Sequence, residues 1–385
     1  MQLKKKFFLV GLLIMFFFCG TGRAYANVTP EITAAAAVVM EAKTGKIVYA
    51  KNPDEKRAPA STTKILTGAL ALEKKQDSLD QMVTTSVKAA ATGESSIWLE
   101  KGEQLTLDQL LYGLLLNSGN DAAVAIAEYV AGSEEEFVRM MNQKAKEVGA
   151  NNTNFANPNG LPNPNHYTTA KDLALIARYA LQNPKFAEIV STKTRTIPWP
   201  GHEWDRKLIN TNKLLWRLEG ANGVKTGYTN AAGHCLVSSA TRNGQQFITV
   251  VLASQNMWDD STNLLEYAFA NFERVTIFQK GDKVADAPVD QGMESKVPLL
   301  TASDLDAVVA KSEVKDLQKK ILLKQRITAP VKQGDIIGKT KIYLYDQEIA
   351  AGDLVAAQDV HQKTLLRSFI KEFWGLFAVM IKSFA

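Results

Sequence analysis

Residues 224–253 have the sequence VKTGYTNAAGHCLVSSATRNGQQFITVVLA, in which apolar side chains tend to recur at every second position. This period is typical of β-strands and predicts strands at 224–228, 235–241 and 247–253. Asn243-Gly244, between the last two strands, is a preferred pair for a two-residue hairpin turn. The segment therefore predicts neighbouring antiparallel strands.

The start of the chain predicts a second strand region, and the middle predicts helices. Apolar stretches at 34–40 and 46–50 flank Lys43-Thr44-Gly45, which indicates an opening hairpin. Apolar residues at helical spacing then predict helices from Ser61 onward, at 105–116, 122–130 and 170–181, and a closing helix at 264–272. Strands at both ends of a helical middle predict an α+β domain, in which an antiparallel sheet is covered by helices.

The sequence changes character near residue 280. Short Val, Ile and Leu stretches are separated by Gly-Asp pairs at 281–282, 334–335 and 352–353. This pattern predicts a small, β-rich second domain over residues 280–360, with one helix at 311–323. The first domain is accordingly expected to span residues 27–279.

Residues 1–26 are predicted to be a signal peptide. Three lysines precede the apolar run 7–18, and Ala24 and Ala26 form a small-residue cleavage site. An uncleaved anchor is the alternative, although the run is short for a bilayer span. Removal of the peptide takes away four positive residues, lowers the net charge from +5 to +1 and leaves Cys235 as the single cysteine. We therefore expect an exported protein with no internal disulfide and no electrostatic basis for nucleic-acid binding.

Residues 361–385 are predicted to form an amphipathic helix. One helical side carries aromatic and aliphatic residues that include Phe369, Phe373 and Phe377, and most of the basic residues lie opposite. The longest uncharged run, 373–381, is too short to cross a bilayer, so the helix is expected to lie on a membrane surface. A terminal helix packed on the protein's own core is the alternative.

Ser61 and Lys64 are three residues apart at the predicted start of a helix. This spacing places the hydroxyl and the ammonium group on one face, about one turn apart. Burial and neighbouring positive charge would lower the lysine pKa and allow its amine to take the serine proton. A helix N-cap followed by a solvated lysine has the same spacing, so this motif alone does not distinguish the two.

Two further polar motifs lie at predicted structural boundaries. Ser118 and Asn120 lie between two helices, where they could relay a proton and hold a substrate amide, or end one helix and cap the next. Lys225, Thr226 and Gly227 lie on a predicted strand. They offer a cation, a hydroxyl and a position with no side chain to obstruct a substrate along the strand edge.

The motifs S-x-x-K, S-x-N and K-T-G in this order are the signature of penicillin-recognising serine acyl-transfer enzymes. The sequence closely resembles one family of them, the low-molecular-weight penicillin-binding proteins that are serine-type D-Ala-D-Ala carboxypeptidases. The likeness includes residues 157–161, 166–170 and 223–229 and covers nearly the whole mature chain. It implies a β-lactamase/transpeptidase-like first domain followed by a β-rich second domain and an amphipathic tail.

The family's activity is removal of the terminal D-Ala from peptidoglycan stem peptides, and β-lactam antibiotics are covalent inhibitors. The resemblance implies that Ser61 is the acylated nucleophile and Lys64 its base. Ser118 and Asn120 would shuttle a proton and bind the peptide amide. The predicted signal peptide and the amphipathic tail together lead us to expect a location at the outer face of the cytoplasmic membrane.

The resemblance also implies roles for the residues of the K-T-G motif. Lys225 would supply positive potential and Thr226 a hydroxyl near the terminal carboxylate of the substrate. Gly227 would leave the strand edge open, and the backbone N–H groups of Ser61 and Tyr228 would form the oxyanion hole.

The match is incomplete at the carboxylate end of the site. Many relatives carry His where this chain has Tyr228, and an Arg where it has residues 256–260. The sequence Trp258-Asp259-Asp260 resembles the sporulation-associated branch of the family. The way in which the carboxylate is held therefore stays open, as does the balance among carboxypeptidase, endopeptidase and transpeptidase activity.

Two alternatives remain. A β-lactamase shares the three motifs, but the E-x-x-L-N-type motif of the class A enzymes does not occur in this sequence. A catalytically inactive peptidoglycan-binding protein is the other. No metal or cofactor is expected, because the four histidines have no metal-binding spacing and the mechanism needs none. We expect His166 to be structural and Cys235 to be a buried apolar residue.

Overall fold

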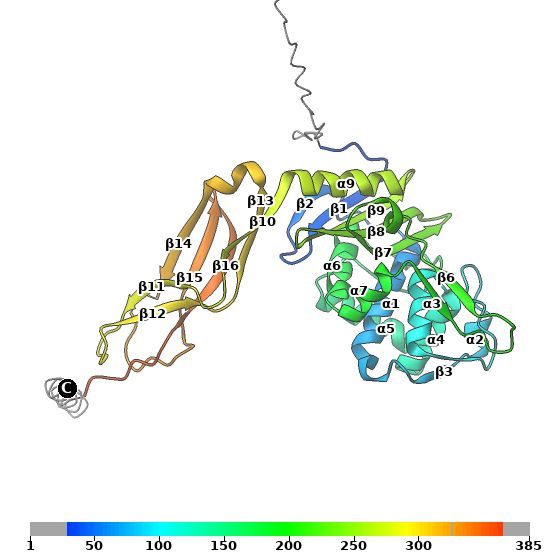
Figure 1. The fold of residues 1–385 in the computed structure, drawn as a ribbon, viewed down its shortest axis with the longest axis horizontal. Helices are drawn as coiled ribbons and strands as arrows, with labels where there is room; N and C mark the ends of the chain where they lie inside the picture. Colours follow the sequence, from blue (N-terminus) through cyan, green and yellow to red (C-terminus); the bar gives the residue numbers. More distant parts are fainter. Residues whose placement is uncertain (1–28, 325, 365–385) are drawn as a thin grey trace, which may run out of the picture.

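The computed structural model describes residues 29–324 and 326–364, which form an α+β domain and a smaller β domain (Figure 1). The sheet of the first domain has the order β2-β1-β9-β8-β7, and its neighbours are antiparallel. Its strands are β1 (Ala36–Glu41), β2 (Ile47–Lys51), β7 (Ala221–Thr229), β8 (Gly233–Arg242) and β9 (Gln245–Ser254). Both ends of the domain's sequence thus supply the sheet, which confirms the α+β prediction.

Helices bury both faces of this sheet. Successive residues of β1 alternate between two cores: Val38 faces the larger helical layer, and Val39 faces the smaller one. The larger layer contains α1 (Lys64–Lys75), α3 (Leu107–Leu116), α4 (Asn120–Ala131), α5 (Glu134–Glu147), α6 (Ala170–Leu181) and α7 (Pro184–Ser191). The other face is covered by α8 (Leu214–Arg217) and α9 (Met257–Asn271).

Helix α6 has the predicted bounds, and the Thr169 side chain accepts a hydrogen bond from the Asp172 N–H as an N-cap. The closing helix α9 begins at Met257, seven residues before the predicted start. Its first turn contains the buried Asp260, whose carboxylate accepts hydrogen bonds from the backbone of Thr33 and Ala34. The polar residues 259–263 separate Met257 and Trp258 from the apolar stripe that begins at Leu264, and the sequence pattern therefore missed the start of the helix.

Helices α5, α7 and α8 were not predicted, and neither were several short elements at one end of the first domain. These short elements are α2 (Val87–Ala90), the strand pair β3 (Met82–Thr84) and β4 (Gln104–Thr106), and the hairpin β5 (Thr194–Ile197) and β6 (Arg206–Ile209). Strand β6 ends two residues before Thr211, which lines the candidate site described below.

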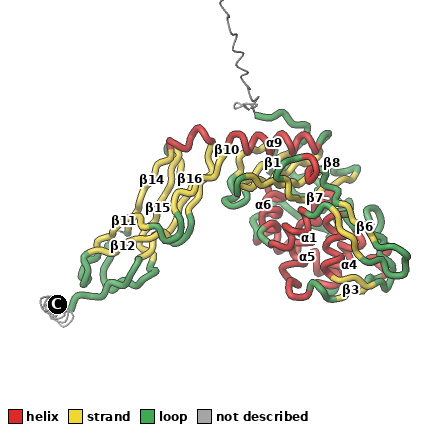
Figure 2. Tube along the Cα trace, in the orientation of Figure 1, coloured by secondary structure: helices red, strands yellow, loops and turns green. Residues whose placement is uncertain are grey.

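The second domain is rich in strands, as predicted (Figure 2). One sheet has the order β11-β12-β16-β15-β14, and β10 (Phe272–Phe278) pairs with β13 (Leu305–Ala310). The sheet consists of β11 (Lys283–Pro288), β12 (Lys296–Thr301), β14 (Leu317–Leu323), β15 (Ile336–Leu344) and β16 (Gln347–Ala356).

The helix predicted at 311–323 is wrong. A 3₁₀ turn occupies Lys311–Asp316, and Leu317–Leu323 form the edge strand β14, paired with β15. Most of β14 is exposed, so hydrogen bonding to the neighbouring strand decides its conformation rather than a buried helical stripe.

The predicted signal peptide and nearly all of the predicted amphipathic helix lie outside the described residues. Within the described ranges, no helix is both long enough and apolar enough to cross a membrane.

Candidate active site

Ser61 lies on a short 3₁₀ turn, Ala60–Thr63, that leads directly into α1. Two threonine hydroxyls brace this turn: Thr62 donates to the Pro59 carbonyl at 2.6 Å and Thr63 to the Ala60 carbonyl at 2.8 Å. Gly160 approaches it so closely that a Cβ at this position would lie 2.0 Å from the Ala60 carbonyl oxygen. The serine is thus fixed in position before the helix begins.

His166 supports the same turn from beneath. Its Nδ1 accepts a hydrogen bond from the Ala156 N–H, so its Nε2 is the ring atom that carries the proton and donates to the Thr63 hydroxyl, 2.8 Å away. Burial, followed by the charge of Lys64, lowers the pKa of His166 to about 4. The neutral, buried imidazole has the structural role that the sequence predicts.

Lys64 lies directly beneath Ser61. Its Nζ is 2.9 Å from the Ser61 Oγ, 2.7 Å from the Asn120 Oδ1 and 2.6 Å from the Asn159 carbonyl oxygen. The side chain is fully buried. Desolvation first, and then the positive charge of Lys225, lower the pKa of Lys64 well below its ordinary value of 10.5. Both causes were expected from the sequence.

These contacts suit a neutral amine. A neutral amine has two N–H donors and one lone pair, and the Asn120 and Asn159 oxygens can only accept hydrogen bonds. The two N–H groups are therefore directed at these oxygens. In this form the lone pair is available to the Ser61 hydroxyl, whereas an ammonium group would donate to the Ser61 Oγ instead.

Ser118 and Asn120 are brought to the same place by the connection between α3 and α4. Ser118 has a positive φ of 66° and is 6% exposed. The Asn120 carboxamide accepts from Lys64 and donates to the Gly93 carbonyl at 2.8 Å, while the Asn120 N–H donates to the Ser95 carbonyl. Asn120 therefore ties Lys64 to residues 93–95, and the second N–H of its carboxamide can donate to a substrate amide carbonyl.

The K-T-G motif lies on β7, which is an edge strand of the sheet, as predicted. Lys225 is 1% exposed, and burial lowers its pKa to about 7. The Thr226 hydroxyl is 2.8 Å from that of Thr211. Gly227 faces the serine turn: a Cβ there would lie 3.1 Å from the Ser61 nitrogen.

Ser61, Ser118, Thr226, Gly227 and Tyr228 line one cavity of about 380 Å³. The other three predicted site residues are buried behind the residues that line the cavity: Lys64, Asn120 and Lys225. The structure therefore brings all eight predicted site residues together, although they come from three distant segments.

The cavity has four further lining residues that sequence reasoning missed, Glu94, Ser95, Asn117 and Thr211. It is also lined by Met257 and Trp258, from the segment 256–260 that the resemblance placed at the carboxylate end of the site. Glu94 has a positive φ of 64°, and its carboxylate opposes the lowering of the Lys64 pKa. Met257 and Trp258 reach the cavity because α9 begins at residue 257. A local pattern does not reveal these residues, since each is placed by long-range contacts.

Comparison with known proteins identifies the family. Residues 23–256 match the family of D-alanyl-D-alanine carboxypeptidases, peptidase S11, and residues 272–362 match the C-terminal domain of penicillin-binding protein 5. The chain belongs to the D-alanyl-D-alanine carboxypeptidase family. It is thus a serine peptidase and a penicillin-binding protein, as the motifs indicate.

Relatives of this family match over most of the chain. The D-alanyl-D-alanine carboxypeptidase DacF of Bacillus subtilis is 38% identical over 351 residues, which cover 89% of each chain. The crystal structure of penicillin-binding protein 5 from Haemophilus influenzae has a TM-score of 0.78 and 32% identity, and the match covers 87% of this chain and 99% of that one.

A shorter relative matches only part of this chain. A Streptomyces K15 DD-transpeptidase structure is 36% identical with a TM-score of 0.60, and the match covers all of that chain but only 63% of this one. The family's serine peptidase domain therefore also occurs in a chain without the second domain found here.

Proposed function

We propose that this D-alanyl-D-alanine carboxypeptidase removes the terminal D-Ala from peptidoglycan stem pentapeptides through an acyl-enzyme on Ser61. The observation that carries the proposal is the 2.9 Å contact between the Ser61 Oγ and the buried Lys64 Nζ at the floor of the cavity. The activity limits cross-linking in the cell wall or the spore cortex.

Acylation begins when the Ser61 Oγ attacks the carbonyl carbon of the penultimate D-Ala. Its proton passes to the Lys64 amine, which is kept neutral by its lowered pKa. Collapse of the tetrahedral intermediate breaks the C–N bond, and the departing D-Ala amine takes a proton by way of Ser118. Water then attacks the Ser61 ester and releases the shortened peptide.

The oxyanion hole in this proposal consists of the Ser61 and Tyr228 backbone N–H groups. The close approach of Gly227 to the Ser61 nitrogen supports this assignment, because it brings β7 against the serine turn. A substrate that adds to the edge of β7 would place its carbonyl between the two groups.

Lys225 and Thr226 would receive the terminal carboxylate, assisted by Thr211, whose hydroxyl touches that of Thr226. Lys225 is buried just behind this end of the cavity, and its ammonium group donates to the Thr226 carbonyl at 3.1 Å. Tyr228 is 55% exposed and packs on His234 at a ring distance of 4.6 Å, so it lies at the rim rather than over the carboxylate.

The location of the enzyme is part of the same proposal. Residues 1–26 direct export and are removed, residues 27–279 catalyse, and residues 280–360 form a spacer domain. Residues 361–385 then hold the enzyme on the outer face of the cytoplasmic membrane.

The test is release of D-Ala from a soluble pentapeptide ending in D-Ala-D-Ala by the purified chain lacking residues 1–26. The wild-type protein should release D-Ala, and Lys64→Ala should be inactive while it retains the wild-type circular dichroism spectrum. A folded wild-type protein that forms a stable penicillin adduct but releases no D-Ala would contradict the carboxypeptidase assignment. Rapid turnover of the penicillin would favour the β-lactamase alternative instead.

A further inference from the structure

An exposed aromatic cluster lies on the surface next to the cavity. The Trp98 ring stacks on that of Trp199 at 6.3 Å and 24°, and the Trp199 ring lies 4.1 Å from that of His202. Trp98 is 63% exposed, and Trp204, on the same β5–β6 turn as Trp199, is 64% exposed. We call Trp98, Trp199 and His202 the aromatic platform.

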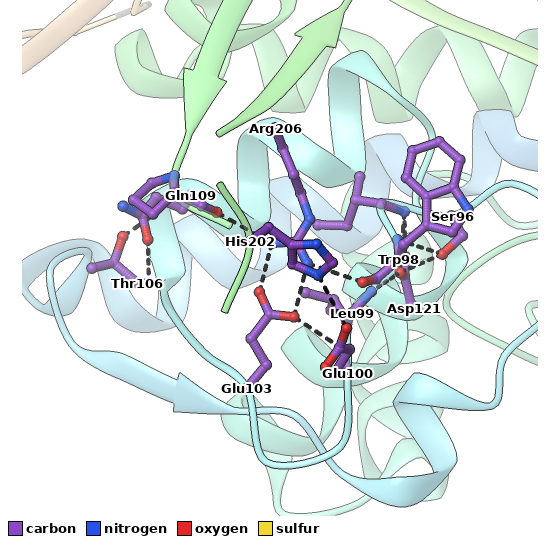
Figure 3. A network of polar contacts seen from close by, with 12 residues as sticks. Ser96, Trp98, Leu99, Glu100, Glu103, Thr106, Gln109, Asp121, His202 and Arg206 are labelled. Atoms are coloured by element: carbon purple, nitrogen blue, oxygen red, sulfur yellow. Dashed lines mark hydrogen bonds and ion pairs between the residues drawn. The ribbon is translucent and has the colours of Figure 1, made fainter. Parts of the chain in front are cut away.

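The Trp98 backbone is held in place by its surroundings (Figure 3). Its φ is +57°, which is rare for a bulky residue and persists only where neighbouring contacts enforce it. The Trp98 N–H donates to the Ser96 hydroxyl at 2.7 Å, and its carbonyl accepts from Arg206 at 2.9 Å. On either side, the Ile97 and Leu99 N–H groups donate to the Asp121 carboxylate.

Arg206 joins the two segments that carry the platform. Its guanidinium group makes two hydrogen bonds to the Glu103 carboxylate, at 2.5 and 2.8 Å, and both side chains are almost fully buried. The same group lies 4.7 Å from the centre of the Trp199 ring. A large apolar ring is therefore kept exposed on a rigid base, so a ligand would bind it at little cost in ordering.

The edges of the platform favour a neutral, hydroxyl-rich ligand. His202 Nε2 lies 3.2 Å from the Glu100 carboxylate, and Glu203 and Asp205 are exposed on the same turn. Exposed Lys101 and Lys207 lie beside these acidic residues, so the surround carries charges of both signs and offers no cationic patch of the kind that nucleic acids and anionic lipid headgroups need. A pyranose ring instead presents an apolar C–H face to an indole and hydroxyl and amide groups to the polar rim.

The platform is within reach of a substrate held at Ser61. Ser95 lines the cavity, and Trp98 follows three residues later, so their Cα atoms are at most about 11 Å apart. Four extended residues of a stem peptide span about 13 Å. Asn117, which lines the same cavity as Ser61, donates to the Ser96 carbonyl, so a stem peptide that extends from Ser61 along this side of the cavity would carry its sugar toward Trp98.

We propose that the aromatic platform is a subsite for the glycan strand of peptidoglycan, in which an N-acetylhexosamine ring stacks on the exposed Trp98 indole. The choice of this ligand rests on the proposed function, since the reach of the stem peptide connects the two sites. The subsite makes the enzyme prefer stem peptides that are attached to glycan over free peptides.

Two measurements on the purified chain lacking residues 1–26 test this subsite. The first is binding of a peptide-free N-acetylglucosamine tetrasaccharide by isothermal titration calorimetry. The second compares kcat/KM for a free pentapeptide with that for soluble glycan chains bearing the same pentapeptide. Trp98→Ala is the test variant, Trp98→Tyr keeps an aromatic face, and Trp216→Ala is the matched control, since Trp216 is 48% exposed outside the platform.

Trp98→Ala should weaken tetrasaccharide binding and lower kcat/KM on glycan-linked substrate about tenfold, the loss expected for roughly 60 Å² of apolar contact. Turnover of free pentapeptide should be unchanged, Trp98→Tyr should retain most of the wild-type binding, and Trp216→Ala should behave as wild type. Absence of tetrasaccharide binding by the wild type, or equal losses on both substrates, would overturn the subsite. A wild-type protein that binds the tetrasaccharide but releases no D-Ala from either substrate would instead refute the proposed function.

Discussion

Gly227→Ala is expected to slow acylation of Ser61 with only a modest loss of stability. The added Cβ would lie 3.0 Å from the Pro59 carbonyl oxygen and 3.1 Å from the Ser61 and Thr62 nitrogens. All three are backbone atoms, so no side chain can rotate away to make room. The hydroxyl of Thr62 holds this turn at the Pro59 carbonyl, and the strand or the turn must therefore shift by a few tenths of an ångström.

A shift of this size is critical for oxyanion-hole donors, which act at 2.7–3.1 Å, and loss of one donor costs about 10²- to 10³-fold in rate. Overpacking by one methyl group costs about 1–3 kcal/mol of stability, so the variant should still fold. The assay is the rate of acylation by a fluorescent penicillin, combined with thermal unfolding. Gly352→Ala is the matched control, because its Cβ would meet only ordinary contacts of 3.6 Å or more. Acylation of Gly227→Ala within threefold of the wild-type rate would refute this account of the oxyanion hole.

Three further outcomes are expected. Penicillin treatment should add the mass of the drug to the wild-type chain but not to Ser61→Ala, and an adduct on that variant, seen by intact mass spectrometry, would assign the nucleophile elsewhere. Burial lowers the His166 pKa from 6.5 to about 4, so its contribution to stability is complete above pH 6.5 and is lost as the pH falls toward 4, by about 3 kcal/mol. Thermal unfolding of His166→Gln should show a weaker pH dependence in this window, and identical slopes would contradict the assignment. Deletion of residues 364–385 should release the enzyme from membranes without loss of turnover on a soluble peptide, whereas a truncated chain that stays in the membrane fraction would place the anchor elsewhere.

The sheet and most of the helices could be predicted because burial imposes a regular period on them. The apolar run 247–253 and the apolar stripe of 170–181 reappear as β9 and α6 with bounds within a few residues. Prediction failed where long-range contacts decide the local conformation. Strand β14 follows the hydrogen bonds of β15, and the first turn of α9 follows the buried carboxylate of Asp260.

The site likewise contains residues that could be predicted from the sequence and residues that only the fold reveals. The motif positions of Ser61, Lys64 and Lys225 are visible in the sequence because acyl-transfer chemistry restricts residue type and spacing. The Asn159 carbonyl that accepts from Lys64 could not be predicted in this way, because every residue has a backbone carbonyl and only the fold brings this one to Lys64. The aromatic platform was missed for a similar reason: Trp98 and Trp199 are far apart in the sequence, and the fold brings their rings together with Arg206 in contact with both residues.

Two buried lysines serve one small cavity, and their protonation states are coupled. Lys64 must be neutral to accept the serine proton, whereas Lys225 must be charged to attract a carboxylate. The charge of Lys225 lowers the pKa of Lys64, while burial alone brings the pKa of Lys225 to about 7. A charged Lys225 therefore favours the neutral form of Lys64 that can accept the serine proton, in addition to the larger effect of burial.

This coupling predicts the pH profile of Lys225→Ala. Without the Lys225 charge, the pKa of Lys64 should rise, and the ascending limb of acylation rate against pH should move to higher pH. The measurement is the acylation rate at saturating penicillin between pH 5 and pH 10, with wild type and Lys213→Ala beside it. Lys213 is an exposed lysine 5.9 Å from the Trp258 ring, so its removal deletes a nearby charge without changing the buried pair. An unshifted limb in Lys225→Ala, or an equal shift in Lys213→Ala, would show that Lys225 does not set the protonation state of Lys64.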